Sequence, residues 1–303
     1  MPEHSDPPFA MPHTRSRANL FPGALPHIAD WEPGRLERRS YVTWSSQALC
    51  ISVWGAIAES SRRRAIVTDV FEAAGVELAL DDEPAIECEV RGRRDVLNEY
   101  GGSNPTCPDV VISWPRAVVT VESKFTEHLG GCSQVKPKQM RTPDGPTRRA
   151  AACSGNHEIG SDLRTKTEAA CRLTIKEGNR SPRLYWQIGA ALFRADVLAA
   201  PRRPCPFRGG SYQLMRNICF AQRLAELERR SSAGFLLAYV EGARSAHETQ
   251  QTFGEFTAML RDDVRPRAGA ISYERIAEIV RQHDAAELAG WIKRRISAGI
   301  APP

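Results

Sequence analysis

Residues 108–124 read PDVVISWPRAVVTVESK, two short apolar runs separated by a Pro-Arg turn. Each run has the length and the β-branched content of a buried strand. Charged residues stand at the ends of these runs, because Asp109 begins the first and Glu122 and Lys124 close the second. Side chains at i and i+2 of a strand point the same way, so Glu122 and Lys124 share one face. If the two strands pair antiparallel, Asp109 and Glu122 converge.

This charged group predicts a metal site that serves phosphodiester hydrolysis. Two carboxylates at one place repel each other unless a cation neutralises them, and oxygen ligands with room left for water suit Mg²⁺. A neighbouring lysine can hold or activate the attacking water while the metal stabilises the developing charge. Residues 122–124 form the only acidic-x-Lys triplet in the chain, and a predicted strand ends there. The alternative is an exposed hairpin with a Glu–Lys surface pair, an arrangement that is common.

The chain before this stretch predicts an arm, two helices and a strand. Residues 1–36 are rich in Pro and His and lack a sustained period, which predicts an extended arm. Residues 45–75 have apolar residues at helical spacing, Ser45 or Ser46 as N-cap and a closing glycine, and the run of three arginines at 62–64 divides them into two helices. Residues 85–92 alternate between apolar and polar, so they predict a strand that completes a three-stranded meander.

The chain after this stretch predicts a crossover. Residues 126–182 are polar and form an insertion with little apolar periodicity, whereas residues 184–199 and 211–230 have helical patterns. A continuous apolar strand follows at 234–242, and a helix that feeds such a strand implies a mixed sheet. We therefore expect one α/β domain over residues 37–245 and a helical cap over 246–303.

Composition limits the classes of protein that fit. The chain has 42% hydrophobic and 25% charged residues, which is ordinary for a globular protein. Its net charge of +5 and its excess of Arg over Lys suit a nucleic-acid partner without requiring one, because a GC-rich coding sequence has the same effect. No run approaches the roughly 18 apolar residues of a membrane span, and the first residues lack the order of a secretion signal. We expect a cytoplasmic protein that binds no membrane.

Asp109, Glu122 and Lys124 resemble the motif of the PD-(D/E)XK nuclease superfamily, the restriction-endonuclease-like proteins. The flanking sequences are similar to a bacterial branch of restriction endonucleases, and the resemblance covers roughly residues 40–245. It implies an αβββαβ core with a mixed central sheet and a helical C-terminal extension. It also implies a Mg²⁺- or Mn²⁺-dependent endonuclease that hydrolyses DNA in bacterial defence or DNA processing. By this resemblance Asp109 and Glu122 bind Mg²⁺, the Ser123 carbonyl adds a ligand, and Lys124 serves the attacking water.

Several roles stay open within this resemblance. A catalytically silent nucleic-acid-binding module could keep the same fold, although it would not need all three motif residues. A nuclease that acts on RNA or on branched DNA is also compatible with the motif, and so is a homodimer. Gln187 and Gln213 lie on the helices after the motif and could orient DNA or the metal ligands, but we expect structural roles for them.

Many members of the superfamily have a further acidic residue near the metal. Candidates on the first helix or the first strand are Glu59, Glu87 and Glu89. We favour Glu99 as a catalytic residue, because its loop leads the chain into Asp109. A solvated loop glutamate is the alternative.

Four cysteines raise a separate question about metal. Cys132, Cys153 and Cys171 lie in the polar insertion, and Cys205 precedes the helix predicted at 211–230. Four thiolates could bind Zn²⁺ or an iron–sulphur cluster and stabilise a segment that has almost no core. The chain has no C-x₂-C pair, however, so unligated cysteines are the alternative.

Overall fold

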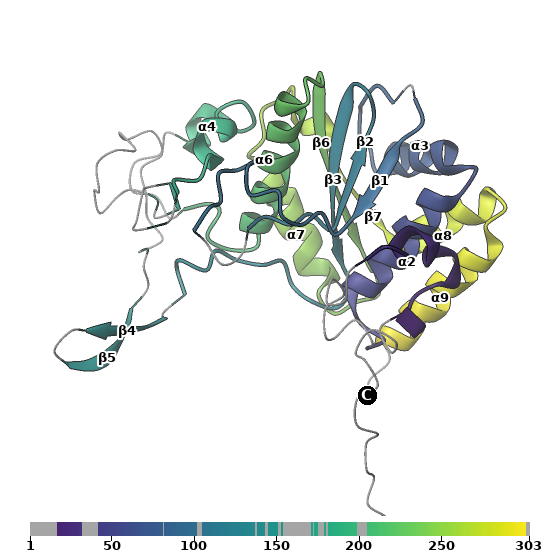
Figure 1. Cartoon of the computed structure of the whole chain (residues 1–303), viewed down its shortest axis with the longest axis horizontal. Coiled ribbons are helices and arrows are strands. Elements are labelled where there is room, and N and C mark those ends of the chain that lie inside the picture. Colours follow the sequence, from purple (N-terminus) through teal and green to yellow (C-terminus); the bar gives the residue numbers. More distant parts are fainter. Residues whose placement is uncertain are drawn as a thin grey trace, which may run out of the picture.

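The computed structural model describes most of the chain outside the N-terminal arm and the insertion. The described residues are 17–31, 42–80, 82–101, 105–136, 138–142, 145–150, 153, 171, 173–174, 179, 181–198 and 205–300. Their centre is a five-stranded sheet with the spatial order β1-β2-β3-β6-β7 (Figure 1). A second, two-stranded sheet consists of β4 and β5.

The elements have the following bounds. The strands are β1 (Ala85–Cys88), β2 (Val110–Ser113), β3 (Ala117–Lys124), β4 (Lys138–Thr142), β5 (Gly145–Ala150), β6 (Ser232–Tyr239) and β7 (Ala268–Ser272). The α-helices are α2 (Ser46–Glu59), α3 (Arg63–Ala73), α4 (Tyr185–Gly189), α5 (Ala195–Leu198), α6 (Ser211–Leu227), α7 (Ala246–Thr257), α8 (Tyr273–Gln282) and α9 (Ala286–Ile300). The 3₁₀ turns are η1 (Pro22–Ala24), η2 (Pro26–Ile28) and η3 (Arg265–Arg267).

The main sheet is mixed, as the sequence predicted. Strands β1, β2 and β3 pair antiparallel as a meander, whereas β6 pairs parallel with both β3 and β7. The parallel register sets Lys124 opposite Tyr239. Helix α6 is the crossover that makes this parallel pairing possible, since it leads directly into β6.

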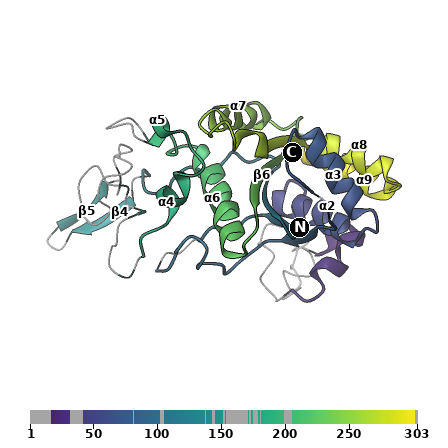
Figure 2. The ribbon, with the colours of Figure 1, turned by 90° about the horizontal axis from the view of Figure 1, so that it is seen from above.

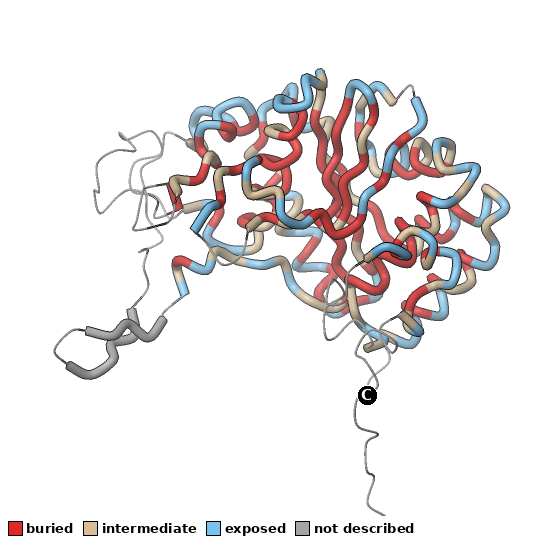
Figure 3. The backbone as a smooth tube through the Cα atoms, viewed as in Figure 1, coloured by how far each residue is buried: buried red, intermediate tan, exposed pale blue. Residues whose placement is uncertain are grey.

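Helices cover both faces of the sheet. In Figure 2 helices α4, α6 and α7 lie on one side of β6, and α2, α3, α8 and α9 lie on the other. Strand β3 serves both layers, because Val118 belongs to the core under α6 while Val119 and Val121 belong to the core under α2. The buried backbone accordingly runs through the middle of the molecule (Figure 3).

The two predicted helices at 45–75 are confirmed. Ser45 caps α2, since its side chain accepts a hydrogen bond from the backbone nitrogen of Ala48 at 3.2 Å. The chain leaves the helical region at Ser60 and starts α3 at Arg63, within the arginine run. Gly75 then adopts a φ of 70°, the left-handed conformation that ends many helices.

The region predicted as one helix at 184–199 is two short helices instead. The chain breaks after α4 because Phe193 turns inward, where its ring lies 4.9 Å from Phe207 and 5.9 Å from Phe256 between centroids. Phe193 also forms a β-bridge with Leu260. Burial of this ring therefore overrides the helical pattern of the sequence.

The extended arm predicted for residues 1–36 is wrong over the part that the structure describes. Residues 17–31 form η1 and η2 and bury Leu20 and Ile28 against α2. Arg295 of α9 links this segment to the C-terminal helix, because its guanidinium donates to the side chain of Asn19. The same guanidinium donates to the carbonyl of Val42, just before α2, at 2.8 Å. Residues 1–16 and 32–36 lie outside the described residues.

The C-terminal region is helical except for β7. This strand, which the sequence did not predict, extends the sheet beyond β6. At the end of α9, Gly299 packs on Phe125 so closely that a Cβ there would lie 2.2 Å from the ring. The boundary at residue 245 stays a prediction. Among the residues that the structure describes, no helix combines the length and apolar character of a membrane span.

Candidate active site

Asp109 and Glu122 lie opposite each other where β2 and β3 meet. Val110 pairs with Val121, so the register sets Asp109 beside Glu122. The backbone nitrogen of Ser123 donates to Oδ2 of Asp109 at 2.7 Å. The predicted hairpin therefore brings the two carboxylates to one place.

Lys124 completes this group. Its Nζ lies 2.8 Å from Oε1 of Glu122 and 3.9 Å from Oε1 of Glu127. Lys124 is 6% exposed and Glu122 is 2% exposed. The pair is therefore not a surface ion pair, because both groups have been removed from water.

Helix α6 supplies two further residues that the sequence reasoning missed or undervalued. Gln213 Nε2 donates to Oε1 of Glu122 at 2.6 Å, and Asn217 Nδ2 donates to Oε2 at 2.5 Å. Residues four apart share a helix face, and Thr120 of β3 holds this face by donating to the Asn217 carbonyl at 3.0 Å. A Gln–Asn pair at i, i+4 beside an apolar face was the signal available in the sequence.

The charges of this group interact strongly. Enclosure by protein raises the pKa of the Asp109 carboxyl well above its usual value, Glu122 raises it further, and Lys124 works in the opposite direction. Burial lowers the pKa of Lys124, but the charges of Glu122 and Asp109 outweigh burial and raise that pKa above its usual value. Lys124 is therefore an ammonium group, and the two acids repel each other.

The donor set suits a hard divalent cation. Two carboxylates that repel each other in an enclosed place are stabilised by such an ion, and Mg²⁺ usually takes only one or two carboxylates besides water and phosphate oxygens. In the part of the chain that the structure describes, no three His, Cys, Asp or Glu side chains are grouped so that they could hold a metal ion.

A small cavity of about 120 Å³ opens beside Glu122. It is lined by Pro105, Thr106, Cys107, Glu122, Gln213, Arg216 and Asn217. The Arg216 side chain is held on two sides, since Nε donates to Thr106 Oγ1 at 2.9 Å and the guanidinium lies 5.4 Å from the ring centroid of Tyr212. The cavity thus sets a fixed cation beside the carboxylate group.

One of three comparisons with known proteins found a match. The family model described as restriction endonuclease associating with ARP (REase-ARP) matches residues 37–295. The chain belongs to the REase-ARP family. A comparison with curated proteins found no match, and a comparison with solved structures found none either. The family confirms the restriction-endonuclease-like resemblance and supports a nuclease.

Glu99 of this REase-ARP protein lies in a buried network beside the cavity. Its Oε1 accepts hydrogen bonds from Tyr185 at 2.6 Å and from Arg183 at 3.0 Å. Thr106 donates to the same carboxylate through its backbone nitrogen and, at 3.1 Å, through its hydroxyl. Arg216 lies 3.8 Å away. Both oxygen atoms of Glu99 are therefore occupied by protein donors.

Glu89 follows β1 and stands in register with the two motif acids. Cys88 pairs with Val110, and the Glu89 backbone nitrogen donates to the Asp109 carbonyl at 2.7 Å. Glu89 is 6% exposed, and its charge raises the pKa of Asp109. Its φ of 53° lies in the left-handed region, which is uncommon for a residue with a side chain.

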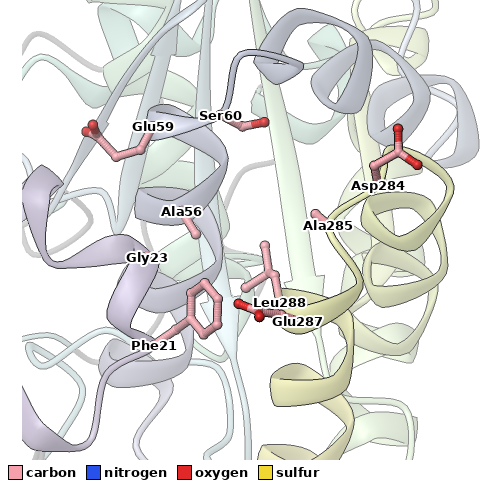
Figure 4. A pocket seen from close by; sticks show the side chains of 9 residues that line it. All are labelled: Phe21, Gly23, Ala56, Glu59, Ser60, Asp284, Ala285, Glu287 and Leu288. Atoms are coloured by element: carbon pink, nitrogen blue, oxygen red, sulfur yellow. The ribbon is translucent and has the colours of Figure 1, made fainter.

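The other acidic candidates and Gln187 lie elsewhere in the REase-ARP fold. Glu87 is exposed on β1, and Gln187 is exposed on α4. Glu59 ends α2 and lines a different cavity, of about 300 Å³, between η1 and the start of α9 (Figure 4). It lies at the C-terminal end of α2, nine residues or about 13 Å along the helix from Cys50.

The cysteines fall into two groups. Cys50, Cys88 and Cys219 are fully buried in the core, as the sequence predicted. The other group consists of the partly buried residues Cys107, Cys132, Cys153, Cys171 and Cys205. The structure describes all eight cysteines, and none forms a disulfide.

Proposed function

We propose that this REase-ARP protein is a metal-dependent DNA endonuclease that hydrolyses phosphodiester bonds. The observation that carries the proposal is the group formed by Asp109, Glu122 and Lys124 at the junction of β2 and β3. A buried pair of acids with a lysine at 2.8 Å is costly to fold, and strongly interacting buried charges of this kind cluster at functional sites. Membership in a restriction-endonuclease-like family supports the same conclusion.

Each residue has a definite part in this proposal. Asp109 and Glu122 would hold Mg²⁺ or Mn²⁺, and the carbonyl of Ser123, the residue after Glu122, would be a further ligand. The bound ion would polarise the phosphoryl oxygen and lower the pKa of water. Lys124, as an ammonium group, donates a hydrogen bond that orients the attacking water. Gln213 and Asn217 fix the Glu122 carboxylate while this happens.

The cavity beside Glu122 suits a phosphate group of DNA. Its volume of about 120 Å³ is below the roughly 300–1,000 Å³ of sites that enclose a whole small ligand. Arg216 presents a planar cation there, which is the geometry that binds phosphate oxygens in pairs. We assign Arg216 to the scissile phosphate.

We propose Glu89 as the third acid of the site, in place of Glu99. Glu89 stands in register beside Asp109. The oxygens of Glu99 are occupied by Tyr185, Arg183 and Thr106. Its role is to hold Arg183 and to orient Arg216, which lines the cavity.

The cellular setting is part of the proposal. None of the eight cysteines forms a disulfide, which suits the reducing cytoplasm. There the enzyme would act in restriction-like defence or in DNA processing. One such site cuts one strand, so cutting of both strands at one position would require two sites, as in a homodimer.

Incubation of supercoiled plasmid with the purified protein tests the proposal. We expect nicked or linear plasmid with Mg²⁺ or Mn²⁺, none with EDTA, and none with the Lys124→Ala variant. The matched control is Lys293→Ala, because Lys293 is exposed on α9. Equal cleavage by both variants would overturn the assigned mechanism. Binding without cleavage would indicate the silent module, and cleavage confined to RNA or branched DNA would redefine the substrate.

A further inference from the structure

Four chain segments that each carry a cysteine are joined by backbone hydrogen bonds and packing. The Cys132 nitrogen donates to the Arg208 carbonyl at 3.1 Å, and the Arg208 nitrogen donates to the Cys205 carbonyl at 3.2 Å. The Cys153 nitrogen donates to the Gln134 carbonyl at 2.9 Å. The segments around residues 132, 153 and 205 therefore lie together, although up to 73 positions separate them (205 − 132).

Cys171 lies near Cys132 and Cys205 because all three contact the same hydrophobic cluster. Cys132, Cys171 and Cys205 all pack against the cluster that contains Trp186 and Phe207. These two rings lie 5.4 Å apart between centroids. The Cys171 turn is closed by Thr174, whose nitrogen donates to the Cys171 carbonyl at 3.0 Å.

The four sulfur atoms are close enough to sense one another's charge. Burial, together with smaller contributions from the charges of the other cysteines, raises the pKa of Cys171 to about 11 and that of Cys205 to about 12. Burial also raises the pKa of Cys132, with a further contribution from Cys153. Together these interactions include all six pairs among the four cysteines.

Backbone amides are also directed at three of the sulfurs. The amides two residues further along, at Gln134, Leu173 and Phe207, donate to Cys132, Cys171 and Cys205 respectively, and each such bond favours the thiolate. Three of the four sulfurs therefore already accept backbone hydrogen bonds. A metal coordinated by the four sulfurs would supply the positive charge that thiolates at one place require, and it would deprotonate the thiols outright.

We propose that Cys132, Cys153, Cys171 and Cys205 form a four-thiolate metal centre that holds Zn²⁺ or an iron–sulphur cluster. Among the described residues, no three His, Cys, Asp or Glu side chains are grouped so that they could hold a metal ion. Metal binding would therefore draw the four sulfurs together and release their protons. The polar insertion at residues 126–182 has little apolar periodicity, and metal binding can supply the folding free energy that such a segment lacks.

The centre would also brace the candidate active site. Cys132 lies two residues after Gly130, whose backbone nitrogen donates to Oε1 of Gln213 at 2.7 Å. Gln213 in turn holds Glu122. The adjoining Gly131 lies so close to the Arg208 carbonyl that a Cβ there would be 3.1 Å from it. A metal at the four cysteines would therefore fix the loops that position the start of α6.

Metal analysis of the full chain, purified without chelators and under anaerobic conditions, tests this proposal directly. We expect stoichiometric zinc, or stoichiometric iron with visible absorption, and the two elements distinguish the two centres. Cys153→Ser should weaken metal affinity by at least about ten-fold, whereas Cys219→Ala should retain the metal because Cys219 is a core residue. Cys153 suits the test because it does not belong to the buried core.

A wild-type experiment keeps the proposal falsifiable if the variants fold poorly. Removal of the metal by a chelator should lower the melting temperature and open the chain around Cys132 and Cys205 to protease. Re-addition of Zn²⁺, or reconstitution with iron and sulphide, should reverse both effects. Zinc and iron both below a tenth of an equivalent would overturn the proposal, and so would disulfides in a thiol count of denatured protein. Metal content is independent of DNA cleavage, so this test can fail while the proposed nuclease activity stands.

Discussion

Gln213 donates from its side-chain nitrogen to Oε1 of Glu122 across 2.6 Å. The same oxygen lies 2.8 Å from Nζ of Lys124, so one donor from a helix and one from a strand contact a single carboxylate oxygen. This sharing leaves the Glu122 side chain a single orientation. Helix α6 is therefore part of the candidate active site.

Gln213→Ala should weaken metal binding and slow cleavage, because Glu122 loses one of the donors that orient it. Removal of a residue that supports a metal ligand typically costs about 10–100-fold in affinity or activity. A titration of plasmid cleavage against Mg²⁺ measures both effects. Gln222→Ala is the matched control, since Gln222 lies on the same helix and contacts Glu226 on the surface. An unchanged Mg²⁺ requirement in Gln213→Ala would contradict the assignment.

Glu89→Gln and Glu99→Gln should fail in different ways. Glu99→Gln leaves Arg183 and Arg216 without their buried counter-charge, and breaking such a pair costs about 3–5 kcal/mol of unfolding free energy. Glu89→Gln affects an ion pair whose partner, Arg91, is exposed, so it should reduce cleavage while the protein stays folded. Denaturant unfolding and plasmid cleavage, measured on both variants, separate these outcomes.

Glu87→Gln is the control for that pair, because Glu87 is exposed on β1 beside Glu89. It should change neither stability nor cleavage. If Glu89→Gln cleaved as well as this control, the third acid would have to be sought elsewhere.

Arg216→Lys should lower kcat by about 100-fold, because an ammonium group cannot replace a planar pair of donors at a developing phosphate charge. Arg223→Lys provides the comparison, since Arg223 pairs with Glu226 on the surface of the same helix. Single-turnover cleavage at saturating DNA, together with melting temperatures, measures the effect. A rise in KM with unchanged kcat would assign Arg216 to ground-state binding instead.

Gly269→Ala should destabilise the fold severely. A Cβ at residue 269 would lie 2.4 Å from the Ala74 carbonyl oxygen and 2.5 Å from Val76, so β7 would have to leave α3. We expect a loss of several kcal/mol, in the upper range of single substitutions. Gly254→Ala in α7 meets nothing within 4 Å and should be neutral or stabilising. Thermal unfolding of the two variants gives the comparison.

The sequence predicts those features that depend on neighbours along the chain. The length and β-branched content of the run at residues 117–124 identify β3, and the tight turn before it makes Asp109 and Glu122 converge. The crossover through α6 follows from a helix that precedes a continuous apolar strand. These are short-range patterns.

Features that depend on distant contacts were missed or misassigned. Gln213 and Asn217 are 91 and 95 positions from Glu122, and their contact depends on how α6 is rotated over the sheet. Glu99 seemed close to Asp109 along the chain, but its partner Arg183 is 84 positions away. Strand β7 has only five residues and three of them are Ala or Gly, so no periodicity marks it.

Because β3 pairs with a strand that lies far along the chain, a delay separates the translation of the two strands. At roughly 5–20 residues per second, Asn217 is translated about 5–20 s after Glu122, given the 95 positions between them. Throughout that interval the nascent β2–β3 hairpin exposes an unpaired edge and two acids without their donors. Chaperones on the ribosome would therefore meet this hairpin well before the strand that covers it is made.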